Sequence, residues 1–486
     1  MPVSNSIIEQ EPLYDQLPVG QEVIFVVSNQ DAVANQTKVK FCAEVHISPT
    51  LQPNTSVSTD IIGTFKTTPN NAGVGIFDLR SIVENYVKAD NMAESISSYK
   101  GTITLNPQIR HPLHLIDKYS FNQNAVKYMV IVFYVEFLGA DDGVNTVDPN
   151  IVRRAAGTNA TSNLFTLFNG YLKYTDILTT GTIAGGDVNN FGYDISDFQP
   201  SSASTGKFLS NAPLTQHANQ DDYGTFAFLV KTGTGSFADG YVDHIDIQCY
   251  DSAGGTLGGV ITVDRDSVNG AYDYWAANSQ YQLLYFGCFP GNLRNWSTIF
   301  QTQLATGNLD HYSVRASHTS GNVTQRYIIN VNCPDGKGYE SIRLCWLNQW
   351  GAWDYYTFTK KSTKSISTKG ATYTQLQGTW NDSVYTVDSY KGGKKSFRVN
   401  STEKIKMNTD FVSEDDNVMF EELINSPEVY QLQGYQTDST DSALNQYVTP
   451  VRLTTSSFTR KTKANDRLIQ YTFEVEKTKT LRTQAV

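Results

Sequence analysis

The stretch RLCWLNQWGAWDYYTF, from Arg343 to Phe358, places three tryptophans around a single carboxylate, Asp354. Aromatic rings beside an acid can form a carbohydrate-processing site, but a glycosidase needs two carboxylates about 5 to 9.5 Å apart. The nearest other acids, Asp335 and Glu340, fall on or near the far turn. A buried aromatic removes roughly 150 to 250 Å² from water, so such residues can hold a sheet together without a ligand. The pattern favours packing, with a sugar platform as the alternative.

The candidate packing or interface residues are aromatic except for one acid. They are Trp346, Trp350, Trp353, Asp354, Tyr356 and Phe358 from this stretch, and Tyr471 and Phe473 near the carboxyl end.

Other groupings of chemically active residues are weaker. In YVDHIDIQ, Asp243 and His244 would point to opposite faces of a strand, which favours separate surface residues over a metal or acid-base cluster with Asp246. The same argument separates His111 from His114 in HPLH. The glycine-rich KTGTGSFADG lacks the Lys and Ser/Thr that follow a phosphate-binding loop. We expect no cofactor or metal site and no enzymatic activity.

Two segments resemble calcium loops, and there is no serine nucleophile motif. VDRDSVNG and GADDGVNTVD are acidic, but neither has the Glu at the twelfth position that a helix-loop-helix calcium site requires. No G-x-S-x-G elbow is present. A calcium ion held by a loop stays open as an alternative.

The cysteines and the apolar runs indicate a protein made in the cytoplasm. Cys42, Cys249, Cys288, Cys333 and Cys345 are odd in number and widely spaced, which is typical of reduced thiols. The amino terminus has no signal-peptide pattern. The longest apolar run, YMVIVFYV, is far shorter than the ~20 residues of a membrane-spanning helix, so we expect no membrane insertion.

Charge changes sign along the chain. The 486 residues carry a net charge of −10, which disfavours tight binding to nucleic-acid phosphates as the main function. Residues 1–150 hold 9 basic and 16 acidic side chains, a net of −7, whereas residues 360–406 hold 10 and 3, a net of +7. This contrast is explained either by a solvated surface of varying sign or by head-to-tail complementarity between neighbouring copies.

Apolar periodicity predicts a mainly β, multi-domain protein of sandwiches and meanders with one or two short helices. The predicted domains are an N-terminal β domain at 1–150 with a short helix near 79–88, a loop-rich central β domain at 151–324, an aromatic meander domain at 325–412, and a C-terminal helix plus hairpin at 413–486.

Individual elements follow from local patterns. KVKFCAEVHI alternates as a half-buried strand, and RYIINVN, ESIRLCWLN and WDYYTFTKK predict a three-strand meander. SEDDNVMFEELINSP predicts a helix from Glu414 to Asn425, with Ser413 and Asp416 as a capping pair. We expect no helix in the central domain, and a terminal hairpin whose second strand buries Tyr471 and Phe473.

The segment ESIRLCWLNQWGAWDYYTFTKKS resembles part of virion proteins from the tails of tailed bacteriophages, in which W/F-L-N-x-x-G-x-x-D-x-x-x-F follows a three-strand turn. The matching residues are Trp346, Leu347, Asn348, Gly351, Asp354 and Phe358. LPVGQEVIFVVSNQD and IIGTFKTTPNNAGVGIFDLRSIVENYV near the start fit the same resemblance, as do FEELINSPEVYQL and PVRLTTSSFTRKTKANDRLIQYTFEVE near the end. Together these segments cover under half of the chain.

The resemblance implies a non-enzymatic building block of a phage tail, at the baseplate, the hub or the tail end. It implies several copies around the tail axis, contact with other tail proteins, and passive contact with packaged DNA. The alternatives are a receptor- or glycan-binding virion protein, a collar or capsid-associated protein, and a polysaccharide hydrolase acting through Asp354.

Overall fold

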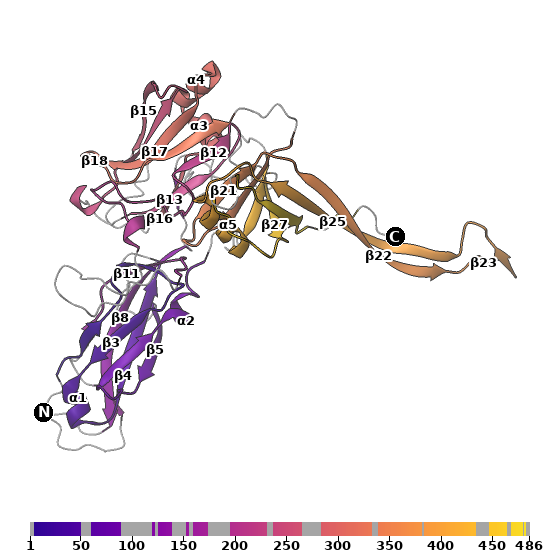
Figure 1. Cartoon of the computed structure of the whole chain (residues 1–486). Coiled ribbons are helices and arrows are strands. Elements are labelled where there is room, and N and C mark those ends of the chain that lie inside the picture. Colours follow the sequence, from indigo (N-terminus) through magenta and orange to yellow (C-terminus); the bar gives the residue numbers. More distant parts are fainter. Residues whose placement is uncertain are drawn as a thin grey trace, which may run out of the picture.

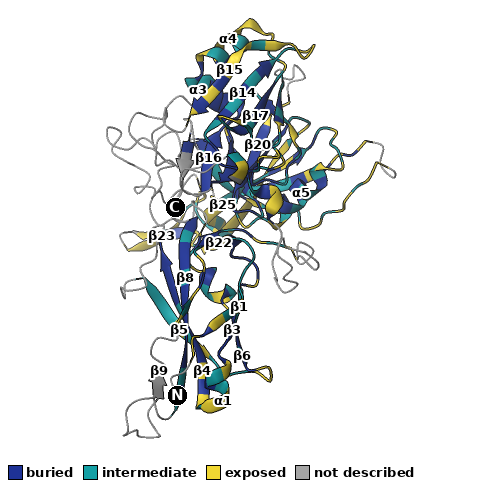
Figure 2. Ribbon diagram, turned by 90° about the vertical axis from the view of Figure 1, so that its left-hand side faces the viewer, coloured by how far each residue is buried: buried dark blue, intermediate teal, exposed yellow. Residues whose placement is uncertain are grey.

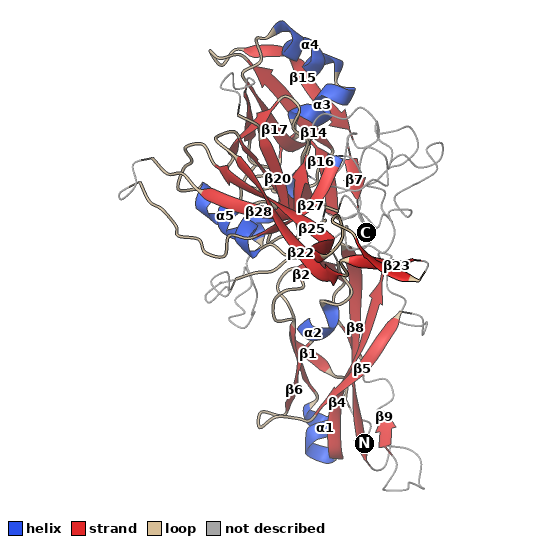
Figure 3. Ribbon diagram, turned by 90° about the vertical axis from the view of Figure 1, so that its right-hand side faces the viewer, coloured by secondary structure: helices blue, strands red, loops and turns tan. Residues whose placement is uncertain are grey.

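The computed structural model describes most of the chain and confirms a mainly β, multi-domain fold of sheets with short helices (Figure 3). The described residues are 4–49, 60–88, 119–121, 125–138, 152–154, 159–173, 195–230, 237–264, 283–332, 339–381, 383–433, 447–463, 468–479 and 481–482. Three hydrophobic cores lie within these ranges.

The N-terminal unit is a sandwich of two sheets. One sheet has the order β1 (Ile7–Gln10), β3 (Ile24–Ser28), β6 (Val74–Asp78). The other has the order β2 (Gln16–Pro18), β11 (Phe165–Phe168), β8 (Val126–Leu138), β4 (Thr37–Ser48), β5 (Ile61–Thr67), with β9 (Val152–Arg154) and β10 (Ala160–Thr161) also paired to β8. Two short helices accompany the sheets, α1 (Gln30–Asn35) and α2 (Arg80–Val83).

Alternation along β4 builds the first core, as the sequence predicts. Val39, Phe41, Ala43, Val45 and Ile47 are all buried. The facing sheet reaches this core through Phe25 of β3 and Phe77 of β6, whose rings lie 5.5 and 5.7 Å from that of Phe133 on β8. Figure 2 shows the long strands β4 and β8 as largely buried.

The central unit packs a six-stranded sheet against a three-stranded one. The larger sheet has the order β12 (Thr215–Asn219), β19 (Tyr327–Asn332), β17 (His311–His318), β14 (His244–Tyr250), β15 (Thr256–Asp264), with β18 (Gly321–Asn322) beside β17. The smaller has the order β13 (Thr225–Leu229), β16 (Leu283–Gly287), β7 (Tyr119–Phe121). The helical segments are η5 (Ser196–Phe198), η6 (Phe237–Asp239), α3 (Pro290–Trp296) and α4 (Thr298–Thr306).

The C-terminal unit is one seven-stranded sheet with α5 (Asp416–Asn425) packed against it. Its order is β21 (Trp353–Phe358), β20 (Ile342–Leu347), β26 (Val429–Leu432), β27 (Val448–Leu453), β28 (Thr472–Lys477), β25 (Gly393–Asn408), β22 (Thr363–Gln375). A separate pair, β23 (Gly378–Asn381) and β24 (Val384–Val387), lies between β22 and β25 in the sequence.

Strand pairing crosses the predicted domain boundaries at residues 150 and 412. The first sandwich continues beyond residue 150 to β11, whereas β7, from the predicted first domain, pairs with β16 of the central unit. The strands of the seven-stranded sheet lie on both sides of residue 412. Pairing between strands far apart in the sequence cannot be predicted from local composition.

The predicted three-strand meander is wrong in its first strand. β19 pairs with β12 and β17 in the central sheet, while β20 has β21 and β26 as neighbours. Tyr327 of β19 explains the choice, because its ring packs 4.9 Å from that of Phe208 and 5.0 Å from that of Phe226. These aromatic contacts bury the strand in the central core.

The helices differ from prediction in number and length. α5 begins two residues later than expected, and Asp416 accepts hydrogen bonds from the backbone N–H and the hydroxyl of Ser413. The helix predicted near 79–88 is regular only at α2. The expectation of no central helix is wrong: α3 and α4 form there. The Ser297 hydroxyl accepts from Phe300 N, and α4 ends at Gly307 in the left-handed conformation.

The molecule is elongated, with the N-terminal sandwich at one end and the central and C-terminal units at the other (Figure 1). The strands β22 and β25 leave the body as a long hairpin with β23 at its far end. We call residues 363–400 the arm. Figure 3 views the molecule from the side toward which the arm points.

Candidate functional site

The aromatic hairpin β20–β21 lies between two cores, which explains its composition. Trp353 and Tyr355 belong to the core of the central unit, whereas Trp346 and Phe358 belong to the C-terminal core. Successive residues of a strand point to opposite faces, so a hairpin covered on both faces needs apolar side chains at nearly every position. The density of aromatics that suggested a sugar platform therefore reflects burial on two sides.

All eight candidate residues lie in or against these cores. Trp346, Phe358 and Phe473 are at most 1% exposed, Trp350, Trp353 and Asp354 are 3% exposed, and Tyr471 is 7% exposed. Tyr356 is partly buried, with its ring 5.0 Å from that of Phe420 on α5. The structure brings Tyr356, Phe358, Tyr471 and Phe473 together around Phe420 in the C-terminal core and places Trp350 and Trp353 in the central core.

The turn between β20 and β21 is organised by Asn348. Its side-chain oxygen accepts from Trp350 N at 2.9 Å and from Ala352 N at 3.1 Å, and its amide donates to the carbonyl of Leu209 at 2.8 Å. Gly351 follows with φ +72°, a conformation that favours glycine. Within the motif that carries the resemblance, Asn348 and Gly351 thus have roles in backbone geometry.

This turn is also where the three units meet. Tyr171 N, beyond the last strand of the first sandwich, donates to Gln349 O at 2.7 Å. A Cβ on Gly351 would come within 2.0 Å of Asn169 O. On the central side, the Phe198 ring lies 4.0 Å from that of Trp350. The turn therefore has no space for a larger residue at position 351.

Asp354 meets a second carboxyl that the sequence does not reveal. Its Oδ1 accepts from the Ser210 hydroxyl at 2.5 Å, and its carboxyl is within hydrogen-bonding reach of Glu422 on α5. Glu422 Oε1 accepts from Asn211 Nδ2 at 2.5 Å. The other two oxygens, Asp354 Oδ2 and Glu422 Oε2, accept no hydrogen bond from a nitrogen or hydroxyl donor in the described chain. A proton on either carboxyl would give both of these oxygens a partner.

The burial of this pair favours its protonated form. Desolvation raises the pKa of Asp354, although hydrogen bonds from Ser210 and Asn348 oppose the shift. Desolvation also raises the pKa of Glu422, and the neighbouring Asp354 charge adds to it. Two carboxylates this close cannot both ionise without a large electrostatic cost. The pair therefore retains a proton to higher pH than an exposed acid does.

The spacing of the pair differs from that of a glycosidase. Carboxyls within hydrogen-bonding reach of each other leave no room for the sugar or the water that occupies the gap of about 5 to 9.5 Å between catalytic acids. Asp354 is 3% exposed and Glu422 is 6% exposed. The sequence held one signal for Glu422: it falls three residues after Met419 and directly before Leu423, both buried on α5.

A second buried polar cluster joins the central and C-terminal units at Arg343 of β20. Its Nε donates to Tyr223 O at 2.8 Å, and its Nη1 donates to Thr357 Oγ1 at 2.8 Å and lies 3.3 Å from Asp222 Oδ2. Thr357 in turn donates to Asp222 at 2.6 Å. The guanidinium lies over the rings of Phe289 and Tyr355, 4.8 and 5.1 Å from their centroids. Both polar clusters fasten the hairpin to its neighbours.

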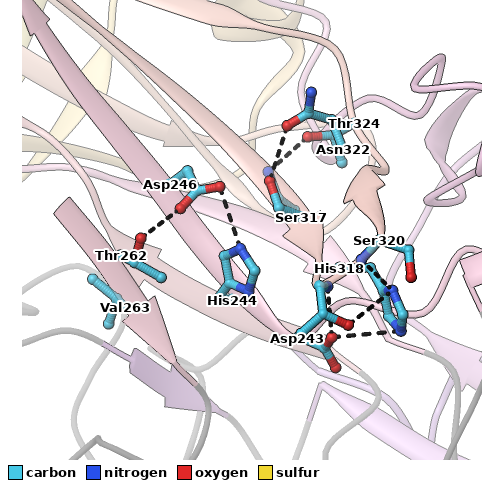
Figure 4. A network of polar contacts seen from close by, with 12 residues as sticks. Asp243, His244, Asp246, Thr262, Val263, Ser317, His318, Ser320, Asn322 and Thr324 are labelled. Atoms are coloured by element: carbon cyan, nitrogen blue, oxygen red, sulfur yellow. Dashed lines mark hydrogen bonds and ion pairs between the residues drawn. The ribbon is translucent and has the colours of Figure 1, made fainter. Parts of the chain in front are cut away.

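His244 and Asp246 of β14 form one pair, and Asp243, directly before β14, forms a separate pair with His318 of β17 (Figure 4). His244 Nε2 lies 3.3 Å from Asp246 Oδ2, and this hydrogen bond raises the pKa of His244 against the effect of burial. Asp243 instead faces His318 Nε2 at 3.4 Å and accepts from Thr319 N at 2.9 Å. His318 Nδ1 accepts from Ser320 N, so its proton lies on Nε2 and points at Asp243.

The remaining sequence candidates are placed as follows. Cys42, Cys249, Cys288 and Cys345 are buried free thiols, and burial raises the pKa of Cys249 to about 11. Across the described ranges, no three His, Cys, Asp or Glu residues gather in a way that could hold a metal ion. No described helix is long and apolar enough to cross a membrane. Cys333, His111, His114, GADDGVNTVD and most of VDRDSVNG and KTGTGSFADG lie outside the described residues.

Comparison with known proteins gives no family. No protein-family model and no curated protein matches the chain. Among solved structures, it is similar to trypsin-activated alpha-2-macroglobulin from Escherichia coli, with a TM-score of 0.18 and 9% identity over 84% of this chain and 23% of that one. It is similar to the native conformation of the E. coli protein, with a TM-score of 0.18 and 7% identity over 83% and 22%. The chain spans less than a quarter of these proteins, and likeness at this TM-score carries no argument.

Proposed function

We propose that the protein is a non-enzymatic structural component of a tailed-phage virion and builds an oligomeric part of the tail at the baseplate, the hub or the tail end. Its partners are copies of itself and other tail proteins, and it contacts packaged DNA only passively. It is made in the host cytoplasm and ends in the virion.

One observation carries the proposal: the motif that gives the resemblance to tail proteins consists of architectural residues. Trp346 and Phe358 fill the C-terminal core, Asn348 and Gly351 shape the turn, and Asp354 joins β21 to α5. Residues of a binding or catalytic site would need exposed functional groups. A motif whose residues hold three structural units together is what we expect in a structural protein rather than in an enzyme or a binding protein.

The buried polar groups support a scaffold in the same way. Asp354 and Glu422 are buried within hydrogen-bonding reach of each other, which leaves no room for a sugar between them, and Arg343 is occupied by Asp222, Thr357 and Tyr223. The ring faces of Trp350 and Trp353 pack in the central core, so neither ring is available as a sugar platform. The elongated body with its projecting arm provides extended surfaces for contacts between subunits (Figure 1).

The test is to locate the chain in purified particles of the phage that encodes it. Mass spectrometry of intact virions should detect the chain, and the signal should disappear from tailless heads of the same phage. Imaging of virions at side-chain resolution should then place the three units in the tail. Detection in tailless heads would assign the chain to the capsid or collar, and absence from all particles would refute the proposal.

Enzymatic activity is tested separately on the purified chain. The Asp354→Asn variant is matched with the unaltered protein on host surface polysaccharide, and neither should release reducing ends. Release by the unaltered chain that is lost in the variant would show that the buried pair is catalytic and would overturn the structural function.

A further inference from the structure

The arm holds more than half of the exposed large apolar side chains of the described residues. Residues 363–400 contain ten of the 19 large apolar side chains that are exposed among the described residues. They are Ile366 at 66%, Tyr373 at 38%, Leu376 at 70%, Trp380 at 67%, Val384 at 60%, Tyr385 at 42%, Val387 at 65%, Tyr390 at 73%, Phe397 at 43% and Val399 at 45% exposed. Apolar side chains concentrated on one projecting element mark an interaction surface.

The backbone of the arm also has unused hydrogen-bonding capacity. β22 ends the seven-stranded sheet and pairs only with β25 among the described strands. β25 pairs with β28 from Lys404 to Asn408 and meets Leu481 at Ser401, but toward the arm tip it has only β22 beside it. A two-stranded ribbon with exposed apolar side chains is marginally stable alone, and its free edges readily accept another chain.

The charge of the arm is opposite to that of the rest of the molecule. Residues 363–400 hold 6 basic and 2 acidic side chains, a net of +4. This leaves 32 basic and 46 acidic side chains, a net of −14, for the remainder of the chain. No acidic side chain of the described residues pairs with Lys369, Lys394 or Arg398. The arm therefore carries free positive charge away from an acidic body.

We infer that the arm docks on the body of a second copy of this chain. Two arms repel each other by charge, whereas an arm and a neighbouring body attract. The arm supplies 38 residues, more than the 20–30 on each side of a standard interface. It points away from its own body, so a body that it contacts would be that of a neighbour (Figure 1).

Contact between an arm and a body is heterologous, because each copy gives one surface and receives with another. Such contacts repeat from copy to copy and close into a ring or continue as a filament. The inference deepens the proposed tail function by naming the contact that would join copies around the tail axis. Self-association itself does not depend on where in a virion the chain lies.

The first test measures the mass of the purified full chain by sedimentation velocity and light scattering at low salt. The unaltered chain should form multimers of its 54.0 kDa mass. The arm variant Trp380→Ser/Val387→Thr/Tyr390→Ser should be monomeric. Charge reversal at Lys369, Lys394 and Arg398 to Glu should raise the Kd of self-association by roughly tenfold or more. A monomeric unaltered chain, or an arm variant that assembles normally, would overturn the inference.

A matched control separates the arm from exposed apolar surface in general. Val260 and Leu468 are 51% and 65% exposed but lie outside the arm. The Val260→Thr/Leu468→Thr variant should assemble as the unaltered chain does, and its circular dichroism spectrum should match that of the arm variant. Equal loss of assembly in the control would show that the arm has no special role.

A second test identifies the surface that receives the arm. Copies grown with ¹⁴N and ¹⁵N are mixed and treated with a carbodiimide, which joins amines to carboxylates in direct contact. The expected products are mixed-isotope peptides that link Lys369, Lys394 or Lys395 to Asp or Glu residues of the body. Links confined to two arms or to one copy would refute docking on a neighbour's body.

Mixtures of arm-variant and unaltered chains, and a DNA-binding assay, distinguish arm-to-body docking from arm-to-arm pairing and from DNA binding. An arm variant should still bind a tagged unaltered chain, because its body accepts that chain's arm. Failure of this capture would indicate arm-to-arm pairing. Retention of double-stranded DNA through the arm, without self-association, would assign the arm to nucleic acid instead. If the chain assembles through its arm but is absent from virions, only the proposed tail function is refuted. If it is a virion protein but stays monomeric, only this inference is refuted.

Discussion

Asp354 on β21 and Glu422 on α5 meet in the interior as a pair of buried carboxyls within hydrogen-bonding reach, although 67 residues separate them in the sequence. The pair joins the aromatic hairpin to the only long helix of the C-terminal unit among the described residues. Ser210 and Asn211 of the central unit donate to its outer oxygens. The carboxyl pair therefore links the central and C-terminal units.

The pair makes stability depend on pH in a defined direction. The folded pKa of Glu422 is raised above its ordinary value of 4.5, so the folded protein binds a proton that the unfolded chain releases. The stability that the protonated Glu422 contributes to the fold is fully present below pH 4.5 and is lost as the pH rises through the raised folded pKa of Glu422. In this window the free energy of unfolding should fall by up to about 1.4 kcal/mol per pH unit.

The Glu422→Gln variant tests this dependence by keeping the shape while removing the titration. Urea unfolding followed by tryptophan fluorescence from pH 4.5 upward should show a smaller slope in the variant than in the unaltered chain. Glu421→Gln is the neighbouring control. Burial raises the pKa of Glu421, but the hydrogen bond from Arg460 contributes to a net lowering of this pKa. The stability that ionised Glu421 contributes is therefore lost as the pH falls, the opposite direction to Glu422. Equal slopes for Glu422→Gln and the unaltered chain would exclude a shared proton.

Arg343→Met should destabilise the junction of the central and C-terminal units strongly. Removal of the guanidinium leaves Asp222 as an uncompensated buried charge, a change that typically costs about 3 to 5 kcal/mol. The Arg343→Met/Asp222→Asn variant removes that charge while position 222 can still accept from Thr357 and Asn219. Urea unfolding should therefore show a smaller loss for the double variant than for Arg343→Met alone. Additive losses would contradict the coupling.

The sequence predicted the elements with strong local signals. β4 buries the alternate residues that its pattern indicated, and α5 follows the capping pair at Ser413 and Asp416. Phe473 on β28 and Tyr471 directly before it are buried as expected, but residues 454–463 form no strand, and β28 pairs with β27 and β25 rather than in the predicted terminal hairpin. In each case a local pattern indicates side chains that the fold buries, although on β4 Cys42, His46 and Ser48 of the opposite face are buried as well.

The parts that could not be predicted depend on contacts between distant segments. β19 joined the central sheet because Tyr327 packs against Phe208 and Phe226, more than 90 residues away in the sequence. Phe300 is the only buried residue of α4, so the apolar periodicity of this helix is weak. Its only local signals are Ser297 and Gly307 at its ends. The partner of Asp354 was missed because no local pattern links a strand residue to an acid on a later helix.

Gly351→Ala should cost more than the same substitution at Gly307, although the two glycines have nearly the same backbone conformation. Their φ angles are +72° and +71°. A Cβ at 351 would lie 2.0 Å from Asn169 O, whereas a Cβ at 307 meets no atom within 4 Å. Gly307→Ala should lose about 1 kcal/mol from backbone strain, and Gly351→Ala should lose that amount plus the cost of displacing the Asn169 backbone.

Urea unfolding of the two glycine variants measures the difference. An excess of at least ~1 kcal/mol for Gly351→Ala would fit the range of overpacked sites. Equal losses would mean that the first sandwich does not press against the turn between β20 and β21.

Tryptophan substitutions separate packing from carbohydrate recognition. Trp346 is fully buried, so Trp346→Ala should cost about 3 to 5 kcal/mol. Trp380 is 67% exposed, and Trp380→Ala should change stability by no more than about 0.5 kcal/mol. Urea unfolding followed by circular dichroism gives both values without relying on tryptophan fluorescence. Glycan-array binding by the unaltered chain that is lost in folded Trp350→Ala or Trp353→Ala would contradict the packing role, because a ring held in the core cannot also stack on a sugar.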